Sequence, residues 1–190
     1  MLNIIIFGPP GAGKGTQSTF IKERYDLTYI STGQILRQEM AAGTEIGLHV
    51  KEIINKGGLA SDEIVTSIIE KFIVNHRDSS GFLFDGFPRT TRQAEILDEL
   101  FRKYDMKLDG VLSLEVPEEM LIDRMLKRGL TSGRDDDNIE SIRYRFIEYN
   151  TKTKPVLDYY QNKNVLHDVN GIGEIEDIFA NICKIIDSIA

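Results

Sequence analysis

The sequence predicts an α/β fold in three layers, with helices on both faces of a five-stranded parallel sheet. Short apolar runs alternate with longer helical patterns, and a glycine-rich loop joins the first apolar run to the first helix. Strands separated by helices form parallel sheets with right-handed crossovers. The expected strands are residues 3–7, 28–30, 81–85, 110–115 and 164–168. Ligands of such sheets bind beyond the carboxyl ends of the strands, so the residues that follow each strand form the candidate site.

The loop after the first expected strand has the spacing of a phosphate-binding loop. Four residues separate Gly8 from Gly13, and Lys14 follows directly at the start of a helical pattern. Inward-facing backbone N–H groups and the positive end of the helix would bind phosphate there, with Lys14 as a point charge. Gly15 stands where serine or threonine is usual, and the hydroxyl comes one residue later, at Thr16.

Length and composition fit one globular domain. The chain has 190 residues, of which 41% are hydrophobic and 28% charged. The net charge of −7 argues against a general binder of nucleic-acid polymers. The single cysteine, Cys183, excludes an internal disulfide or a Cys/His zinc cluster, and we expect it to pack in a final helix over residues 174–190. Neither a signal peptide nor a membrane span is evident, which predicts a cytoplasmic protein.

The segment between the second and third expected strands is longer than a simple crossover. Helical patterns cover residues 32–39 and 46–55, and Ser61 is expected to cap a further helix. The excess, residues 31–60, predicts a small helical insertion above the strand ends. The alternative is a surface elaboration without a role.

The third expected strand ends in a carboxylate, Asp85. An acid beside a phosphate-binding loop typically holds Mg²⁺ or its water molecules. Because Gly15 offers no hydroxyl, we expect phosphate oxygens and water to hold Mg²⁺, with Asp85 orienting the water. Arg89 follows Pro88, which restricts the local backbone. Gln93, in the first turn of the next helical pattern, could pair with a base edge through its amide.

Arginines accumulate on segments expected near the strand ends. Arg124 and Arg128 share one face of a helix that we expect to end at Gly129, followed by a polar loop and a new helix capped by Asn138. Any single arginine is more often a solvated surface charge. Guanidinium groups suit phosphate, however, and the set comprises Arg37, Arg89, Arg124, Arg128, Arg134 and Arg145.

Several of these motifs together resemble the adenylate kinases. They are Gly-Pro-Pro-Gly-Ala-Gly-Lys-Gly-Thr-Gln at 8–17, Ser-Thr-Gly at 31–33 with Leu36-Arg37, Asp-Gly-Phe-Pro-Arg at 85–89, and Lys-Arg-Gly at 127–129 continuing to Asp136-Asp137-Asn138. They cover nearly the whole chain in the right order. The Gly-Lys-Gly-Thr loop variant and the Asp-Gly-Phe-Pro-Arg block are specific to nucleoside monophosphate kinases.

The resemblance implies a single kinase domain with two mobile parts. Residues 31–60 correspond to the monophosphate-binding insertion and 127–137 to the short form of the lid. The core then comprises residues 1–30, 61–126 and 138–190. Family habit implies a monomer.

The resemblance also implies residue roles. The catalytic set would be Lys14, Arg89, Arg124, Arg128, Arg134 and Arg145. ATP would be bound by Gly11, Ala12, Gly13, Lys14, Gly15, Thr16, Arg128 and, through its backbone, Gly173. AMP would be bound by Thr32, Arg37, Gly58, Leu59, Ala60, Gly86, Arg89, Gln93, Arg134 and Arg145.

The implied reaction is the reversible, Mg²⁺-dependent transfer of the terminal phosphoryl group of ATP to AMP, which gives two ADP. The acceptor is already an anionic oxygen, so the reaction needs no general base. It needs charge neutralisation, in-line positioning and the exclusion of water. Two alternatives remain: a UMP/CMP kinase of the same family, against which Thr32 and Gln93 are modest evidence, and, remotely, a non-catalytic nucleotide-binding switch.

Overall fold

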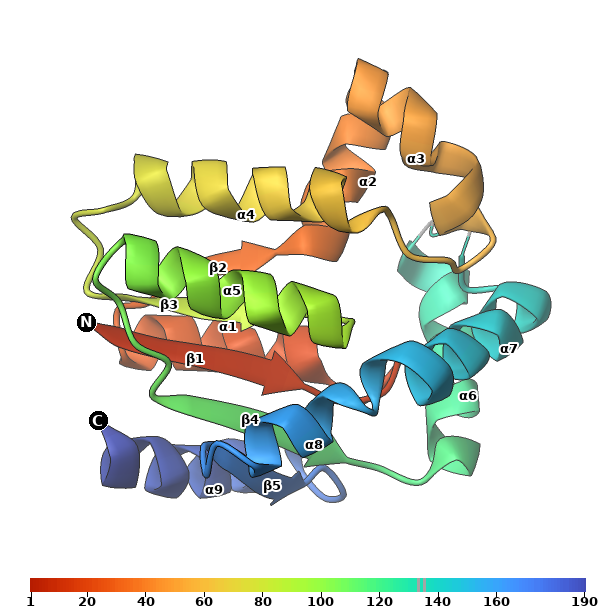
Figure 1. The fold of residues 1–190 in the computed structure, drawn as a ribbon. Helices are drawn as coiled ribbons and strands as arrows, with labels where there is room; N and C mark the ends of the chain where they lie inside the picture. The colour runs from red at the N-terminus through yellow and green to blue at the C-terminus, as the bar shows by residue number, and fades with distance from the viewer. Residues whose placement is uncertain (133, 135) are drawn as a thin grey trace.

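A computed structural model describes residues 1–132, 134 and 136–190 of the chain. Figure 1 shows its strands and helices in chain order. The strands are β1 Leu2–Phe7, β2 Thr28–Ser31, β3 Gly81–Asp85, β4 Gly110–Glu115 and β5 Leu166–Asn170. The helices are α1 Lys14–Arg24, α2 Thr32–Ala42, α3 Glu45–Asn55, α4 Asp62–Asn75, α5 Thr91–Lys103, α6 Glu118–Ser132, α7 Ile139–Glu148, α8 Val156–Gln161 and α9 Ile175–Ile189, with a π-helical segment, Tyr149–Thr153, between α7 and α8.

The sheet confirms the predicted fold class. Its five strands run parallel in the order β2-β3-β1-β4-β5. The strand order reverses at β1, and in such sheets the crevice at this switch point holds the ligand. The glycine loop follows β1 and therefore stands at the centre of the carboxyl edge.

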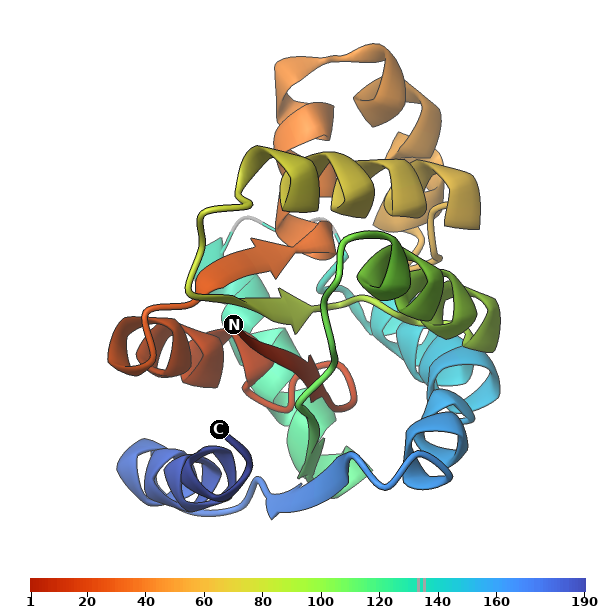
Figure 2. The same ribbon diagram turned by 60° about the vertical axis from the view of Figure 1, so that its left-hand side comes forward.

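Side chains alternate along the strands into two cores. On one face, Ile5 and Phe84 pack among residues of α4, α5 and α8. On the other, Ile4 and Leu83 pack among residues of α1 and α9. The sheet is thus the middle of three layers (Figure 2). Cys183 is buried in α9, as its apolar setting predicted.

Helix caps follow the sequence. Ser61 accepts a hydrogen bond from the backbone N–H of Ile64 at the start of α4, and Asn138 accepts one from Ser141 at the start of α7. The π-helical segment ends at Thr153, and α8 begins after Pro155, which is its N-cap residue. Among the described residues, no helix is both long and apolar enough to cross a lipid bilayer.

Several predicted boundaries differ from the structure by one to three residues, and two of these differences have a clear physical reason. Helix α6 does not end at Gly129 but continues to Ser132. A Cβ atom added at Gly129 would lie 2.9 Å from the backbone oxygen of Asp137, so the glycine permits a close approach and does not end the helix. Strand β5 begins at Leu166 and not at residue 164, because Asn164 adopts a left-handed turn (φ 57°) after α8.

Candidate active site

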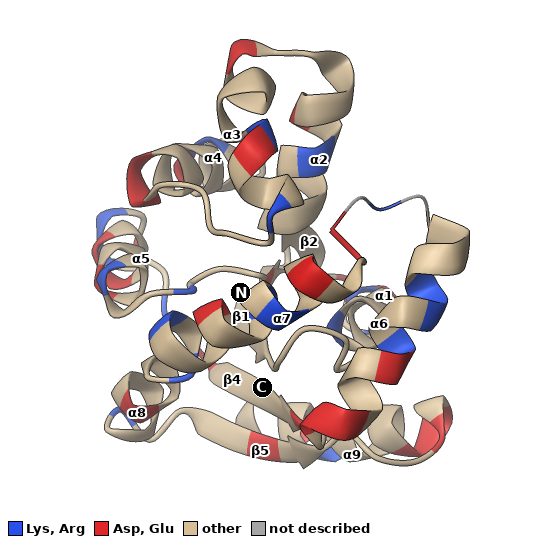
Figure 3. Cartoon of the chain, turned by 90° about the vertical axis from the view of Figure 1, so that its right-hand side faces the viewer, with Lys and Arg blue, Asp and Glu red and all other residues tan. Residues whose placement is uncertain are grey.

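Two adjoining cavities lie at the carboxyl ends of the strands. The larger, here the large cleft, holds about 2320 Å³ of open space between the glycine loop and α6. The smaller, here the small pocket, has about 520 Å³ of space, part of it open to solvent, between α2 and the segment that follows α3. Arg37, Arg89 and Arg145 line both cavities and mark their junction. Figure 3 shows basic segments of α2, α6 and α7 on this side of the molecule.

The structure brings all the sequence-predicted site residues to these two cavities. Those in the large cleft alone are Gly11, Ala12, Gly13, Lys14, Gly15, Thr16, Asp85, Arg124, Arg128, Arg134 and Gly173. Those in the small pocket alone are Thr32, Gly58, Leu59, Ala60, Gly86 and Gln93. Residues expected to bind ATP therefore line the large cleft, and most of those expected to bind AMP line the small pocket. Arg134 is the exception, because it was expected to bind AMP and lies in the large cleft.

Lys14 is the first residue of α1 and lies at the base of the large cleft. Its ammonium group donates hydrogen bonds to the backbone oxygens of Gly8 (2.7 Å) and Pro9 (3.0 Å). Burial lowers the pKa of Lys14 from 10.5 to about 8; the Asp85 carboxylate opposes this, and nearby guanidinium groups add to it. A phosphate group in the cleft would supply the negative charge that this site lacks.

The small pocket is built from polar groups already held by the protein. The Thr32 hydroxyl and Arg89 Nε both donate to the backbone oxygen of Gly86, each at 2.8 Å. The Gln93 amide accepts from the backbone N–H of Arg89 and donates to Asp62 Oδ1, both at 2.7 Å. Thr32 and Gln93 are each only 2% exposed. The amide that we expected to face a base is thus anchored at both its oxygen and its nitrogen.

Burial also lowers the pKa values of the arginines at the junction. The pKa of Arg37 is lowered to about 10, through burial first and then repulsion from Arg134. Burial lowers the pKa of Arg89 and of Arg145 as well, while the carboxylates of Asp85 and Asp136 partly compensate. Buried cations with incomplete pairing favour an anionic ligand.

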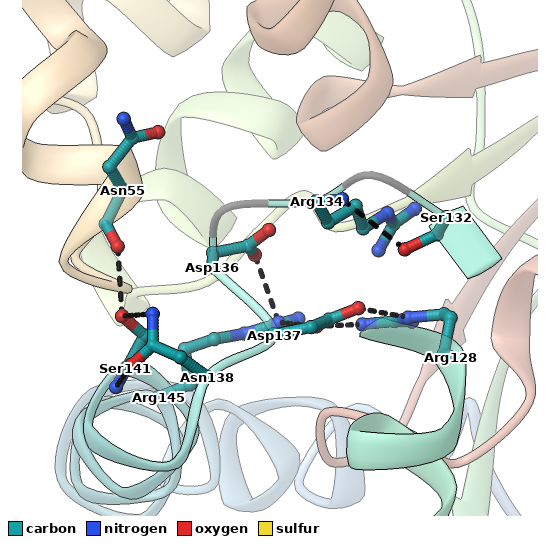
Figure 4. Close-up of polar contacts among 9 residues, drawn as sticks. All are labelled: Asn55, Arg128, Ser132, Arg134, Asp136, Asp137, Asn138, Ser141 and Arg145. Carbon is teal, nitrogen blue, oxygen red and sulfur yellow. Dashed lines mark hydrogen bonds and ion pairs between the residues drawn. The ribbon is translucent and has the colours of Figure 1, made fainter. Parts of the chain in front are cut away.

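Two aspartates after α6 pair with site arginines (Figure 4). Asp137 accepts from Nε (2.7 Å) and Nη2 (2.6 Å) of Arg128 and from Arg145 (3.0 Å), while Asp136 pairs with Arg145 at 2.9 Å. The Asp137 side chain is fully buried. Burial alone would raise its pKa, but the hydrogen bonds and charges of Arg128, with the charge of Arg145, give a net lowering.

Helix α7 is also fastened to the end of α3. The Ser141 hydroxyl donates to the backbone oxygen of Asn55 at 2.9 Å and accepts from the Asn138 amide at 3.0 Å (Figure 4). Gly58, Leu59 and Ala60, which wall the small pocket, follow Asn55 in the chain. One helix therefore carries Arg145 and supports the wall of the small pocket.

Comparison with known proteins agrees with this geometry. The family model described as adenylate kinase matches residues 6–165. The adenylate kinase of Porphyromonas gingivalis strain W83 is 49% identical over 187 residues, covering 98% of this chain and 96% of the relative. Those of Bacteroides fragilis (strain ATCC 25285) and Flavobacterium psychrophilum are 46% and 45% identical, with both chains covered completely.

The chain belongs to the adenylate kinase family. Adenylate kinases are phosphotransferases, and the named relatives favour neither a UMP nor a CMP kinase.

The described carboxylates of this adenylate kinase family member are too dispersed to bind a magnesium ion by themselves. They suit an ion whose ligands would be mainly phosphate oxygens and water. Among the residues that the structure describes, no three His, Cys, Asp or Glu side chains gather into a metal-binding group. Asp85, 9% exposed, lines the large cleft, where its charge acts on Lys14. Mg²⁺ keeps several water molecules and takes few protein ligands beside phosphate oxygens, so one carboxylate in this place suits it.

Sequence reasoning missed the residues that hold the site residues in place. Asp62, at the start of α4, anchors Gln93, and no sequence pattern indicated this role. Asp136 and Asp137 entered the sequence analysis only as part of a motif, and the structure makes them buried partners of Arg128 and Arg145. Their place beside Arg134 in a family motif was the available signal. Asp135, in the same run, lies outside the described residues.

Proposed function

We propose that this adenylate kinase family member transfers the terminal phosphoryl group of ATP reversibly to AMP, giving two ADP, with Mg²⁺ as cofactor. The observation that carries the proposal is the junction of the large cleft and the small pocket at Arg37, Arg89 and Arg145. Two nucleotides bound from opposite sides would bring their phosphates together at these guanidinium groups.

The large cleft is the proposed ATP site. The backbone of residues 11–16 and the start of α1 would bind the phosphates, with Lys14 on the transferred group. Arg128 and Arg124, one turn apart on α6, would add charge from the opposite wall. Gly173, in the loop before α9, would contact the base through its backbone.

The small pocket is the proposed AMP site. The backbone of residues 58–60 and the Thr32 side chain would face the nucleoside, and Gln93 would do so from its anchored position. Arg37, Gly86 and Arg89 would bind the acceptor phosphate, with Arg134 and Arg145 closing over the phosphates.

Catalysis in this arrangement is positioning and charge neutralisation. The attacking oxygen of AMP is ionised at neutral pH, so no residue has to remove a proton from it. Lys14 and the arginines would stabilise the charge that spreads over the phosphoryl oxygens in the transition state. When bound, Mg²⁺ neutralises charge on the ATP phosphate oxygens, and Asp85 would orient its water molecules.

Residues 31–60 and 127–137 are the proposed mobile insertion and lid over a core of residues 1–30, 61–126 and 138–190. Their closure around both nucleotides would exclude water, so that ATP is not hydrolysed. Domain lids of kinases commonly move in this way. We further propose that the protein is a cytoplasmic monomer. Size-exclusion chromatography of the purified protein tests the oligomeric state.

A panel of acceptors tests the function. Purified protein is incubated with ATP, Mg²⁺ and either AMP, UMP or CMP, and ADP formation is measured. We expect AMP to give the highest kcat/KM. A higher value with UMP or CMP would reject the acceptor assignment. Intact nucleotide binding without ADP formation from any acceptor would instead support a non-catalytic switch.

A further inference from the structure

A tyrosine next to the proposed metal site holds Asp85. Tyr29 lies in β2, and its hydroxyl donates a 2.8 Å hydrogen bond to Asp85 Oδ2 at the end of β3. The two strands pair in parallel, with Ser31 opposite Asp85, so the phenol reaches forward along the sheet to the carboxylate. Both side chains line the large cleft.

Among the described residues, the cationic side chains near Asp85 donate hydrogen bonds to backbone oxygens and not to the Asp85 carboxylate. Lys14 donates to backbone oxygens of the glycine loop, and Arg89 Nε donates to the backbone oxygen of Gly86. Within the described part of the chain, the Tyr29 hydroxyl is the hydrogen-bond partner of this carboxylate. The phenol thus restrains one oxygen, Oδ2, and leaves Oδ1 to accept a hydrogen bond from water.

We propose that Tyr29 is a positioning residue for the magnesium site: its hydrogen bond fixes the Asp85 carboxylate so that Oδ1 accepts from metal-bound water. The inference rests on the proposed role of Asp85 in this reaction. A carboxylate acting through water depends strongly on its own orientation, because it has no direct metal bond to fix it. Partners behind metal-binding groups commonly contribute about 10–100-fold to metal affinity or activity.

The chain offers a matched control. Tyr25 also donates from its hydroxyl to an aspartate, Asp187 Oδ1, at 2.6 Å. That pair joins α1 to α9 on the surface, where the Asp187 side chain is 53% exposed. Tyr25→Phe and Tyr29→Phe therefore both remove a tyrosine–aspartate hydrogen bond, one outside the cleft and one inside it; Tyr25→Phe also removes a longer bond (3.3 Å) to the backbone oxygen of Cys183.

The experiment measures Mn²⁺ affinity by electron paramagnetic resonance with the protein saturated by ADP. Wild type, Tyr29→Phe, Tyr25→Phe and Asp85→Asn are titrated, and the affinity for ADP is measured separately in EDTA. We expect about tenfold weaker Mn²⁺ binding in Tyr29→Phe, a larger loss in Asp85→Asn, and wild-type binding in Tyr25→Phe. ADP affinity in EDTA should be unchanged in Tyr29→Phe, and excess Mg²⁺ should restore its turnover.

The outcomes distinguish a failure of the proposed role of Tyr29 from a failure of the proposed phosphoryl transfer. Wild-type Mn²⁺ affinity in Tyr29→Phe with a loss in Asp85→Asn overturns the role of Tyr29 alone. A loss of metal-free ADP affinity equal to the loss of Mn²⁺ affinity in Tyr29→Phe also overturns it, because the tyrosine would then support the cleft and not the metal. Unchanged Mn²⁺ affinity in Asp85→Asn overturns both roles but leaves phosphoryl transfer to AMP standing.

Discussion

The large cleft and the small pocket differ in how their polar side chains are engaged. In the small pocket, Thr32, Arg89 and Gln93 are fixed by hydrogen bonds to neighbouring backbone or to Asp62. In the large cleft, Lys14 is bound to carbonyl groups of its own loop and Arg128 to Asp137. A phosphate group bound in the large cleft would therefore have to compete with these partners for the positive charges, whereas the small pocket is already organised. Preorganised groups contribute to affinity at lower entropic cost.

The largest expected effect separates rate from affinity across the two cavities. Lys14→Ala should reduce kcat by about 10²–10³-fold, the usual cost of one lost charge-stabilising donor, while the dissociation constant of AMP stays near that of wild type. Arg89→Ala should mainly weaken AMP binding, because Arg89, although it lines both cavities, is held by the Gly86 backbone oxygen in the wall of the small pocket. Steady-state kinetics and equilibrium binding of each nucleotide measure both. Equal losses of affinity for ATP and AMP in both variants would contradict the division.

The second expected effect concerns the aspartates that pair with the cleft arginines. Asp137→Ala leaves Arg128 without its partner and removes one carboxylate from Arg145. We expect the free energy of unfolding to fall by about 2–3 kcal/mol. This is less than the cost of breaking a fully buried ion pair, because Arg128 is one-third exposed and Arg145 keeps its ion pair with Asp136. Urea denaturation measures the change.

A control and the pH dependence sharpen this prediction. Asp123→Ala removes the exposed pair with Lys127 on α6 and should change stability by less than about 0.5 kcal/mol. Folding lowers the pKa of Asp137, so its stabilising contribution is complete above the ordinary aspartate pKa and is lost as pH falls through the lowered value. A wild-type advantage over Asp137→Ala that persists undiminished in strong acid would refute the ion-pair explanation.

The third expected effect tests the contact between the small pocket and α7. At Gly57 (φ 86°), an added Cβ would lie 2.6 Å from Arg145 Cγ and 2.7 Å from the backbone oxygen of Ser141. Gly57→Ala should therefore displace the pocket wall from Arg145 and raise the KM for AMP about tenfold, with little change in the KM for ATP. Kinetics with each substrate varied in turn measure this selectivity.

Gly43→Ala is the matched control, because Gly43 also has positive φ (65°) but nothing lies within 4 Å of its added Cβ. It carries the backbone strain without the collision. Similar rises in the KM for AMP in both variants would assign the effect to strain and remove the argument for a fitted contact.

The sequence predicted the elements that local chemistry specifies. The glycine loop, the apolar strands and the caps at Ser61 and Asn138 each depend on neighbours within a few residues, and the structure confirms them. Strand ends also predicted which residues meet, because parallel strands place their carboxyl ends along one edge.

What could not be predicted depends on contacts between distant segments. Gly129 was interpreted as a helix end because glycine often ends helices, but the return of the chain at Asp137 explains it. The bond from Gln93 to Asp62 spans 31 residues and that from Tyr29 to Asp85 spans 56. No local pattern encodes these pairs; only packing shows which side chain holds a site residue in place.

The smallest expected effect is a proton taken up with ATP in the large cleft and not with AMP in the small pocket. Without phosphate, burial holds the pKa of Lys14 at about 8, so much of the ammonium has lost its proton at pH 8.5. ATP phosphates favour the charged form and raise that pKa, so binding at pH 8.5 should take up a fraction of a proton, and ATP affinity should fall as pH rises above about 8. Calorimetric titrations in two buffers of different ionisation enthalpy measure the uptake.

Two controls apply to this proton uptake. Uptake should be near zero in wild type at pH 7, where Lys14 is already protonated, and near zero at pH 8.5 in Lys14→Ala. Equal proton uptake in Lys14→Ala and wild type at pH 8.5 would show that another group takes up the proton. It would contradict the prediction that ATP binding raises the pKa of Lys14.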